Sequence, residues 1–136
     1  MERTLVICKP DAVERGLAGA IVGRLEAKGL RLVAAELRTI DRGTAGRHYG
    51  EHKGKPFYES LVEFITGGPA LLLAVEGPVG TIGMVRSLMG ATDPRQAAAG
   101  TIRGDLATAV TENLVHGSDS AESAARELKL FFPALA

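Results

Sequence analysis

Several features that would narrow the class of this protein are scarce or absent in its sequence. There is one cysteine, Cys8, so an internal disulfide is excluded. Lysine plus arginine and aspartate plus glutamate both number 16, so the net charge is zero and non-specific binding to nucleic acid is not indicated. The longest uninterrupted apolar run, from Pro69 to Val75, is far too short to cross a membrane.

The amino-terminal stretch also lacks the pattern of a secretory signal, because Lys9 and Asp11 follow a short apolar-leaning run. Together with the single cysteine, this predicts a cytoplasmic protein. The chain is 46% apolar and 24% charged, which is typical of a folded protein, and its length suits one domain over residues 1–136. Because the net charge is zero, any affinity for phosphate must come from a local cluster of residues and not from the charge of the whole protein.

Both common glycine-rich motifs for nucleotides are missing. The chain contains no G-x-x-x-x-G-K-[ST] and no G-x-G-x-x-G. A nucleotide site in this protein would have to be built without a P-loop or a Rossmann turn.

Hydrophobic patterning predicts alternating strands and helices, an order that by itself favours a parallel sheet. Strands are expected at residues 3–8, 30–40 and 69–75, with a bulge or a doubly covered segment near residues 33–35. Helices are expected at residues 17–28, 44–54, 57–65 and 82–89, followed by a long ordered loop at 91–102 and a helical turn after Asp105. The chain turns at residues 41–43, and the segment Lys9-Pro10-Asp11 is expected to end the first strand.

Residues 113–120, N-L-V-H-G-S-D-S, place His116 where a strand would pass into a helix. Asp119 is expected to be the N-cap of that helix, and Glu122 completes a capping-box pattern. Ala121, Ala125, Leu128 and Phe132 are expected to form its apolar face. His116 would then lie close to a helix N-terminus, where free N–H groups and the helix dipole favour an anion.

Three other interpretations compete with a phosphate-handling histidine. The first is that His116 is a partly buried, hydrogen-bonded structural residue. The second is a zinc site at His48 to His52, which matches H-x-x-E-H, although Gly50 weakens the helix and no third ligand is evident. The third is a Ser/His hydrolase using Ser118, but the chain has no G-x-S-x-G elbow.

Five sequence blocks together resemble one known family. They are V-I-C-K-P-D, H-Y-G-E-H-K-G-K-P-F, S-L-M-G-A-T-D-P, G-T-I-R-G-D and N-L-V-H-G-S-D-S-A-E-S-A, and they occur in this order over nearly the whole chain. Because it contains all five blocks in this order, the chain resembles nucleoside diphosphate kinases. The last block resembles the active-site signature of that family.

The resemblance implies a ping-pong phosphotransferase in which His116 takes the γ-phosphoryl group of a nucleoside triphosphate, mainly ATP, and passes it to a nucleoside diphosphate. It implies Mg²⁺ as cofactor, held mainly by nucleotide phosphates and water and by no dedicated protein ligands. By motif position, the resemblance implies that the transferred group is held by Lys9, Tyr49 and Asn113, with Asn113 also reaching the ribose, and that the inner phosphates are held by Arg86, Thr92 and Arg103. It implies that Phe57 and Val110 sandwich the base beside Leu61. It also implies that Glu127 supports His116, with Ser118 bonded to Glu127.

The family also implies a ferredoxin-like α+β sandwich with a four-stranded antiparallel sheet flanked by helices. It implies a homo-oligomer, a tetramer or hexamer built from dimers, with the long loop near the trimer contact of the hexamer. A non-catalytic nucleotide-binding or scaffold protein on the same fold is the alternative function.

Four positions depart from the pattern expected of the family, and none of them removes a catalytic group. Ala99 replaces a common proline before Gly-Thr-Ile-Arg, which puts the role of the loop in assembly in doubt. Ala12, Leu106 and Phe131 stand where Gly, Phe and Trp are frequent.

Overall fold

A computed structural model describes residues 1–135; Ala136, the last residue of the expected domain, lies outside the described residues. Four strands form one sheet in the order β2-β3-β1-β4, and all neighbouring strands pair antiparallel. The strands are β1 (Glu2–Cys8), β2 (Arg31–Arg38), β3 (Ala70–Gly77) and β4 (Val115–Gly117).

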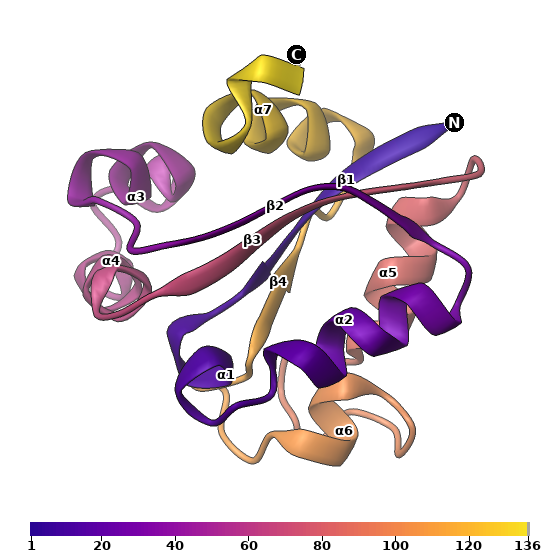
Figure 1. The fold of residues 1–136 in the computed structure, drawn as a ribbon. Helices are drawn as coiled ribbons and strands as arrows, with labels where there is room; N and C mark the ends of the chain where they lie inside the picture. The colour runs from indigo at the N-terminus through magenta and orange to yellow at the C-terminus, as the bar shows by residue number, and fades with distance from the viewer. Residues whose placement is uncertain (136) are drawn as a thin grey trace.

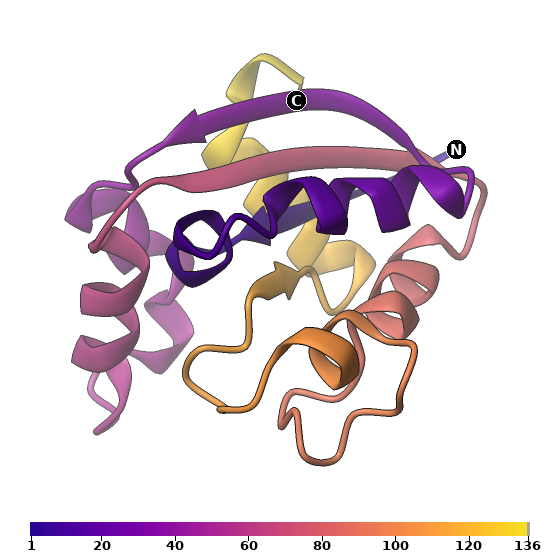
Figure 2. The same ribbon diagram turned by 60° about the horizontal axis from the view of Figure 1, so that its bottom comes forward.

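Helices cover both faces of this sheet (Figure 1). On one face lie α2 (Ala18–Ala27) and α5 (Thr81–Met89), and on the other lie α3 (Arg42–His48) and α7 (Ala121–Phe131). The short helix α1 (Pro10–Glu14) and α4 (Tyr58–Thr66) lie at one end of the sheet, and α6 (Ile102–Leu106) lies on the same side as α2 and α5 (Figure 2). Single turns at Gly50–His52 and Pro133–Leu135 complete the described elements.

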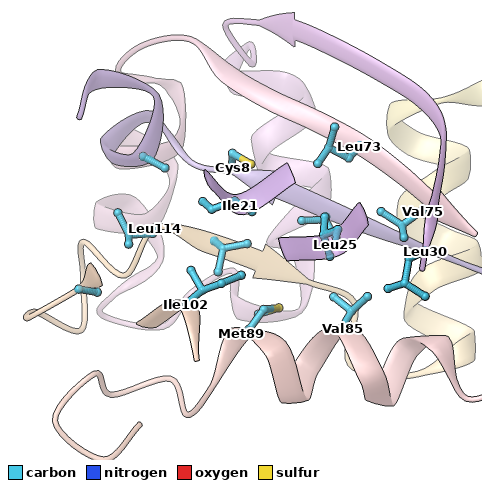
Figure 3. Close-up of a cluster of buried hydrophobic side chains, with 14 residues drawn as sticks. Cys8, Ile21, Leu25, Leu30, Leu73, Val75, Val85, Met89, Ile102 and Leu114 are labelled. Atoms are coloured by element: carbon cyan, nitrogen blue, oxygen red, sulfur yellow. The ribbon is translucent and has the colours of Figure 1, made fainter. Parts of the chain in front are cut away.

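The two central strands separate two hydrophobic cores. In β1, Val6 and Cys8 point to the core under α2 and α5, whereas Leu5 and Ile7 point to the core under α7. Figure 3 shows the first core, where Ile21 of α2 and Met89 of α5 pack around the sheet together with Cys8. Because both faces are covered, β1 and β3 are apolar almost throughout, a pattern that parallel strands share. The pattern of the strands therefore could not distinguish the two kinds of sheet. Because all pairs are antiparallel, the predicted parallel sheet is wrong, and the antiparallel ferredoxin-like sandwich is confirmed.

Element boundaries differ from the expectations mainly at short helices. The bulge near residues 33–35 is confirmed as a register shift between Leu32 and Ala34. The predicted stop after the first strand is followed by α1, which the sequence interpretation missed; its first residue, Pro10, has a fixed φ that suits a first helical position. The helical turn is expected after Asp105, but α6 begins at Ile102, because the side chain of Thr101 caps it by accepting from Gly104 N.

Helix α3 begins earlier and ends sooner than expected. Asp41 caps α3 by accepting from the amide of Thr44, so this helix begins at residue 42 rather than 44. It ends at residue 48, and the rest of the expected 44–54 helix is the single turn at Gly50–His52.

The carboxyl-terminal helix begins one residue later than predicted and buries only part of the predicted face. The Oγ of Ser120 accepts from Ser123 N, so Ser120, and not Asp119, is the N-cap of α7. Of the four residues expected on its apolar face, Phe132 is buried and Leu128 packs against the core, whereas Ala121 and Ala125 are exposed. The buried residues within the helix are Ala124, Glu127 and Phe131. Within residues 1–135, none of the helices combines the length and the apolarity needed to cross a bilayer.

Candidate active site

One cavity of about 570 Å³ lies where the end of β1 meets β4, α3, α4, α5, α6 and α7. It is lined by eleven of the twelve residues that the sequence singled out: Lys9, Tyr49, Phe57, Leu61, Arg86, Thr92, Arg103, Val110, Asn113, His116 and Glu127. The twelfth, Ser118, is buried behind the wall of the cavity, where it bonds to Glu127.

His116 is held by a buried carboxylate. Its Nε2 lies 3.0 Å from Oε1 of Glu127, and the same oxygen accepts a 2.7 Å hydrogen bond from Oγ of Ser118. Burial of Glu127 favours its protonated form, but the hydrogen bond and charge of His116 and the bond from Ser118 outweigh burial and hold the pKa of the carboxyl below its usual range. An ionised carboxylate can only accept, so Nε2 carries a proton, and in the neutral form of the ring the lone pair is on Nδ1.

Two arginines fix the backbone on either side of His116. Arg103 donates to the carbonyl oxygens of Val115 at 2.6 Å and Gly90 at 3.0 Å, while Arg86 donates to that of Gly117 at 3.1 Å. Burial, and then the nearby charge of Arg86, lower the pKa of Arg103 to about 10, so it stays charged near neutral pH. Both guanidinium groups thus bring positive charge to the cavity from anchored positions.

A third cation enters from the end of β1. Nζ of Lys9 donates to Oδ1 of Asn113 at 2.6 Å, and Nδ2 of Asn113 donates to the carbonyl oxygen of Thr92 at 2.9 Å. Burial lowers the pKa of Lys9 to about 8; Asp11 counteracts this shift and Arg103 adds to it. Lys9 is therefore a half-buried cation that gains from an anionic ligand.

The backbone before His116 adopts an uncommon conformation that sequence reasoning missed. Leu114 has a φ of +74°, the only positive φ at a non-glycine residue in the part of the chain described. Its amide donates to Oδ2 of Asp11 at 3.0 Å and its carbonyl accepts from the amide of Lys9 at 2.9 Å. These two bonds, together with complete burial of its side chain, offset a backbone cost of roughly 1–2 kcal/mol.

The mouth of the cavity is apolar. Phe57 and Val110 are two of the few large apolar side chains that are well exposed, at 45% and 46%, and Leu61 is half-buried beside them. The apolar residues of the segment 57–65 are thus divided: Val62 and Ile65 enter the core, whereas Phe57, Leu61 and Phe64 line the cavity.

His48 is a neighbour of His116 that sequence reasoning assigned to a different cluster. Its ring packs edge-on to that of His116, with centroids 4.8 Å apart at 85°, and it is 4% exposed. Burial, followed by the charge of His116, lowers the pKa of His48 to about 3, so the ring is neutral. The H-x-x-E-H zinc site is not supported: among residues 1–135 the group of metal-ligating side chains around His48 contains His116 and Glu127, and not His52.

The combination of these groups defines a class of protein. A histidine with an available ring nitrogen, three cations around it and an apolar slot at the cavity mouth suit transfer of a phosphoryl group from a nucleotide. The fold and site are those of a nucleotide-binding phosphotransferase.

Comparison with known proteins identifies the family within that class. The family model described as nucleoside diphosphate kinase matches residues 2–136. The chain is 60% identical over 136 residues to a nucleoside diphosphate kinase of Thermobifida fusca, covering 100% of both chains, and 58% identical over 134 residues to that of Parafrankia sp., covering 98% of this chain and 97% of the relative.

Solved structures agree with this assignment. A nucleoside diphosphate kinase family protein from Babesia bovis has a TM-score of 0.95 at 47% identity, covering 99% of this chain and 90% of the other. A halophilic nucleoside diphosphate kinase from Halobacterium salinarum in complex with CDP has a TM-score of 0.93 at 50% identity, covering 96% and 87%. The chain belongs to the nucleoside diphosphate kinase family and is a kinase that binds nucleotides.

Proposed function

We propose that this chain transfers the γ-phosphoryl group of a nucleoside triphosphate, mainly ATP, to nucleoside diphosphates through a phosphohistidine on His116. The observation that carries the proposal is the 3.0 Å contact between Nε2 of His116 and the carboxylate of Glu127 in a cavity lined by Lys9, Arg86 and Arg103. A covalent intermediate lets one site serve the donor and the acceptor in turn, in a ping-pong cycle.

The nucleophile of this cycle is Nδ1 of His116. Its lone pair attacks the γ-phosphorus, the bond to the bridging oxygen breaks, and the nucleoside diphosphate leaves with that electron pair. Glu127 accepts the hydrogen bond of Nε2–H and stabilises the positive charge that the ring gains. A terminal oxygen of an incoming diphosphate then takes the phosphoryl group and restores the neutral ring.

The cations hold the phosphates in line with Nδ1. Lys9, Asn113 and Tyr49 are assigned to the transferred group by their motif positions in the family, and all three line the cavity with His116. Burial, together with the nearby Glu127, raises the pKa of Tyr49 to about 12, so its hydroxyl stays a hydrogen-bond donor. Arg86, Arg103 and Thr92 are assigned to the inner phosphates. Phosphoryl transfer depends mainly on such positioning and charge stabilisation.

The apolar mouth accounts for a broad range of bases. Phe57 and Val110 would hold the base between them with Leu61 beside it, and Asn113 would reach the ribose. Stacking between apolar groups does not read the Watson–Crick edge, so several bases can be accepted.

Mg²⁺ is the proposed cofactor, brought in by the nucleotide. Glu51 and Asp119 are exposed on the cavity wall, and the close group of metal-ligating side chains in residues 1–135 is rich in nitrogen, which suits Mg²⁺ poorly. The ion therefore fits as a species held by phosphate oxygens and water, where it would neutralise phosphate charge.

Labelling with γ-labelled ATP tests this function. The protein should acquire an acid-labile, base-stable phosphate that unlabelled GDP removes, and His116→Ala should abolish it. His52→Ala, which changes a histidine of the same cavity that is not assigned to the chemistry, should still become labelled. Persistent labelling of His116→Ala would overturn the assignment. A labelled wild type also rejects the alternative of a non-catalytic scaffold.

We further propose a homo-oligomer, a tetramer or hexamer built from dimers, that acts in the cytoplasm. Strand β2 is at the edge of the sheet, and Ala35, Glu36 and Leu37 are all exposed although they alternate between its faces. An uncovered edge strand is a template for pairing with a second copy. The single, buried Cys8 suits a reducing compartment. Light scattering would separate tetramer from hexamer, and Leu37→Glu should reduce the assembly.

A further inference from the structure

We propose that His48, His116 and Glu127 form a binding site for a borderline divalent cation such as Zn²⁺, and that the bound ion switches off the nucleophile. This site is distinct in chemistry from the Mg²⁺ carried by the nucleotide, because two of its three ligands are imidazoles. Its effect on phosphoryl transfer rests on the proposed function of His116, whereas metal binding itself does not.

The three side chains come from separate elements and converge on one point. One ligand atom from each of His48 in α3, His116 in β4 and Glu127 in α7 lies within 4.8 Å of the other two. Nε2 of His116 and Oε1 of Glu127 are already 3.0 Å apart. Ligand atoms around a tetrahedral zinc at 2.0–2.1 Å are separated by about 3.3 Å. Small rotations of the His48 and His116 rings would therefore close the site.

No role assigned above explains why a histidine is buried at position 48 with an unpaired ring nitrogen. It is 4% exposed, and its Nδ1 is buried without a hydrogen-bond partner. A buried polar atom without a partner costs roughly 1–3 kcal/mol, so a ligand that engages the ring of His48 is favoured. A neutral imidazole is also the form that binds a metal.

The set of ligands matches zinc better than magnesium. Two histidines and one glutamate, with room for water at a fourth position, are a donor set that zinc adopts in open sites. The cavity beside them supplies that fourth position. Mg²⁺ prefers oxygen ligands and retains its water, so it does not compete for this site.

Metal binding would change the tautomer of His116. In the metal-free protein Nε2 carries the proton that Glu127 accepts, and Nδ1 carries the lone pair. When the ion takes the lone pair of Nε2 and an oxygen of Glu127, the single proton of the neutral ring moves to Nδ1. No proton is gained or lost, but Nδ1 then has no lone pair with which to attack phosphorus.

Binding is tested first on the nucleotide-free full chain. Calorimetric titration with zinc chloride should give one ion per chain, and crystals grown with zinc should show an anomalous peak between His48, His116 and Glu127. His48→Phe keeps the aromatic packing against Phe131 and Tyr49, and His48→Gln keeps polarity; both should bind zinc at least about tenfold more weakly. His52→Gln is the matched control and should bind like the wild type.

Several results would overturn the site. They are the absence of the anomalous peak in wild-type crystals, unchanged affinity in a folded His48 variant, or an equal loss of affinity in His52→Gln. The anomalous peak decides the matter even if neither His48 variant folds.

The effect on chemistry is measured as the rate of labelling by Mg·ATP with and without saturating free zinc. Zinc should slow the wild type at least about tenfold, while the rate of each His48 variant relative to its own zinc-free rate should not change. Equal slowing in wild type and His48 variants would reject the tautomer switch. If the wild type is not labelled even without zinc, the proposed function fails, and the calorimetry and the anomalous peak still decide the metal site.

Discussion

Nε2 of His116 and Oε1 of Glu127 lie 3.0 Å apart, although the two residues belong to a strand and to the second turn of the following helix. The helix that begins at Ala121 therefore carries the group that orients the imidazole. Its length and its starting residue decide where the carboxylate lies.

Replacing Glu127 with Gln should slow phosphorylation of His116 by roughly ten- to a hundredfold. The amide can still accept from Nε2–H, so the fold is retained, but a hydrogen bond to a charged group is worth about 1.5–3 kcal/mol. Nucleotide affinity should be retained, because Glu127 is assigned no phosphate contact. Rapid-quench labelling measures the rate, and Glu122→Gln, an exposed carboxylate on the same helix, is the control. An unchanged rate in Glu127→Gln would remove it from the mechanism.

The pH dependence of kcat/KM should report Lys9. Its pKa is lowered to about 8 because burial disfavours the charged form of the amine. This charged form is the one that attracts phosphate. The value of kcat/KM should therefore fall as the pH rises through about 8, since this ratio reflects groups of the free enzyme. Lys9→Arg should move the fall to higher pH. A profile identical to that of the wild type would show that another group causes the fall.

The lowered pKa of Lys9 should make the stability of the protein rise with pH over a range in which kcat/KM falls. A lysine whose folded-state pKa lies below its unfolded value is destabilising while it is charged in the folded protein. The contribution of Lys9 to the free energy of unfolding should therefore increase between pH 8 and its ordinary pKa near 10.5. Denaturant titrations of wild type and Lys9→Met across this range isolate it: the stability difference between them should change with pH in that direction. A difference that is independent of pH would contradict the depressed pKa.

How far the sequence could predict this site depends on the range of the interactions. Local patterns were enough to place Lys9 at the end of a strand and His116 between a strand and a helix, and the family blocks named the remaining groups. Asp11 could not be assigned, because its contact to Leu114 joins residues 103 positions apart. His48 was missed for the same reason: its partners come from β4 and α7.

The error in the phase of α7 has a physical cause. Hydrophobic periodicity treats glutamate as a surface residue, so it placed Ala121 and Ala125 in the core. Glu127 is 4% exposed because Ser118 and His116 bond to it, and these bonds are visible only in three dimensions. The functional residue of the helix is therefore the one that overrides the apolar pattern.

Arg103→Lys should reduce the free energy of unfolding by about 2–3 kcal/mol and raise KM. The guanidinium of Arg103 bonds to three carbonyl oxygens, and an ammonium group cannot reach all of them, which leaves buried acceptors unpaired. Denaturant unfolding and steady-state kinetics measure the two effects. Arg95→Lys, at an exposed pair with Asp93, should change stability by less than about 1 kcal/mol. A loss of the same size in both variants would show that the carbonyl contacts are unimportant.

Gly117 and Met89 should be energetically coupled. A Cβ at Gly117 would lie 2.5 Å from Sδ of Met89, so Gly117→Ala should cost about 1–3 kcal/mol by overpacking β4 against α5. Met89, which is 2% exposed, should cost about 2–5 kcal/mol when it is replaced with Ala, because a cavity remains. In the double variant the added methyl group occupies part of that cavity, so the sum of the two single costs should exceed the cost measured for the double variant by about 1 kcal/mol.

Because Gly117 follows His116, the labelling rate should fall in Gly117→Ala and partly recover in the double variant. Strict additivity of the unfolding free energies would contradict this close contact, and Gly83→Ala, where a Cβ meets no other atom within 4 Å, is the control for adding a methyl group.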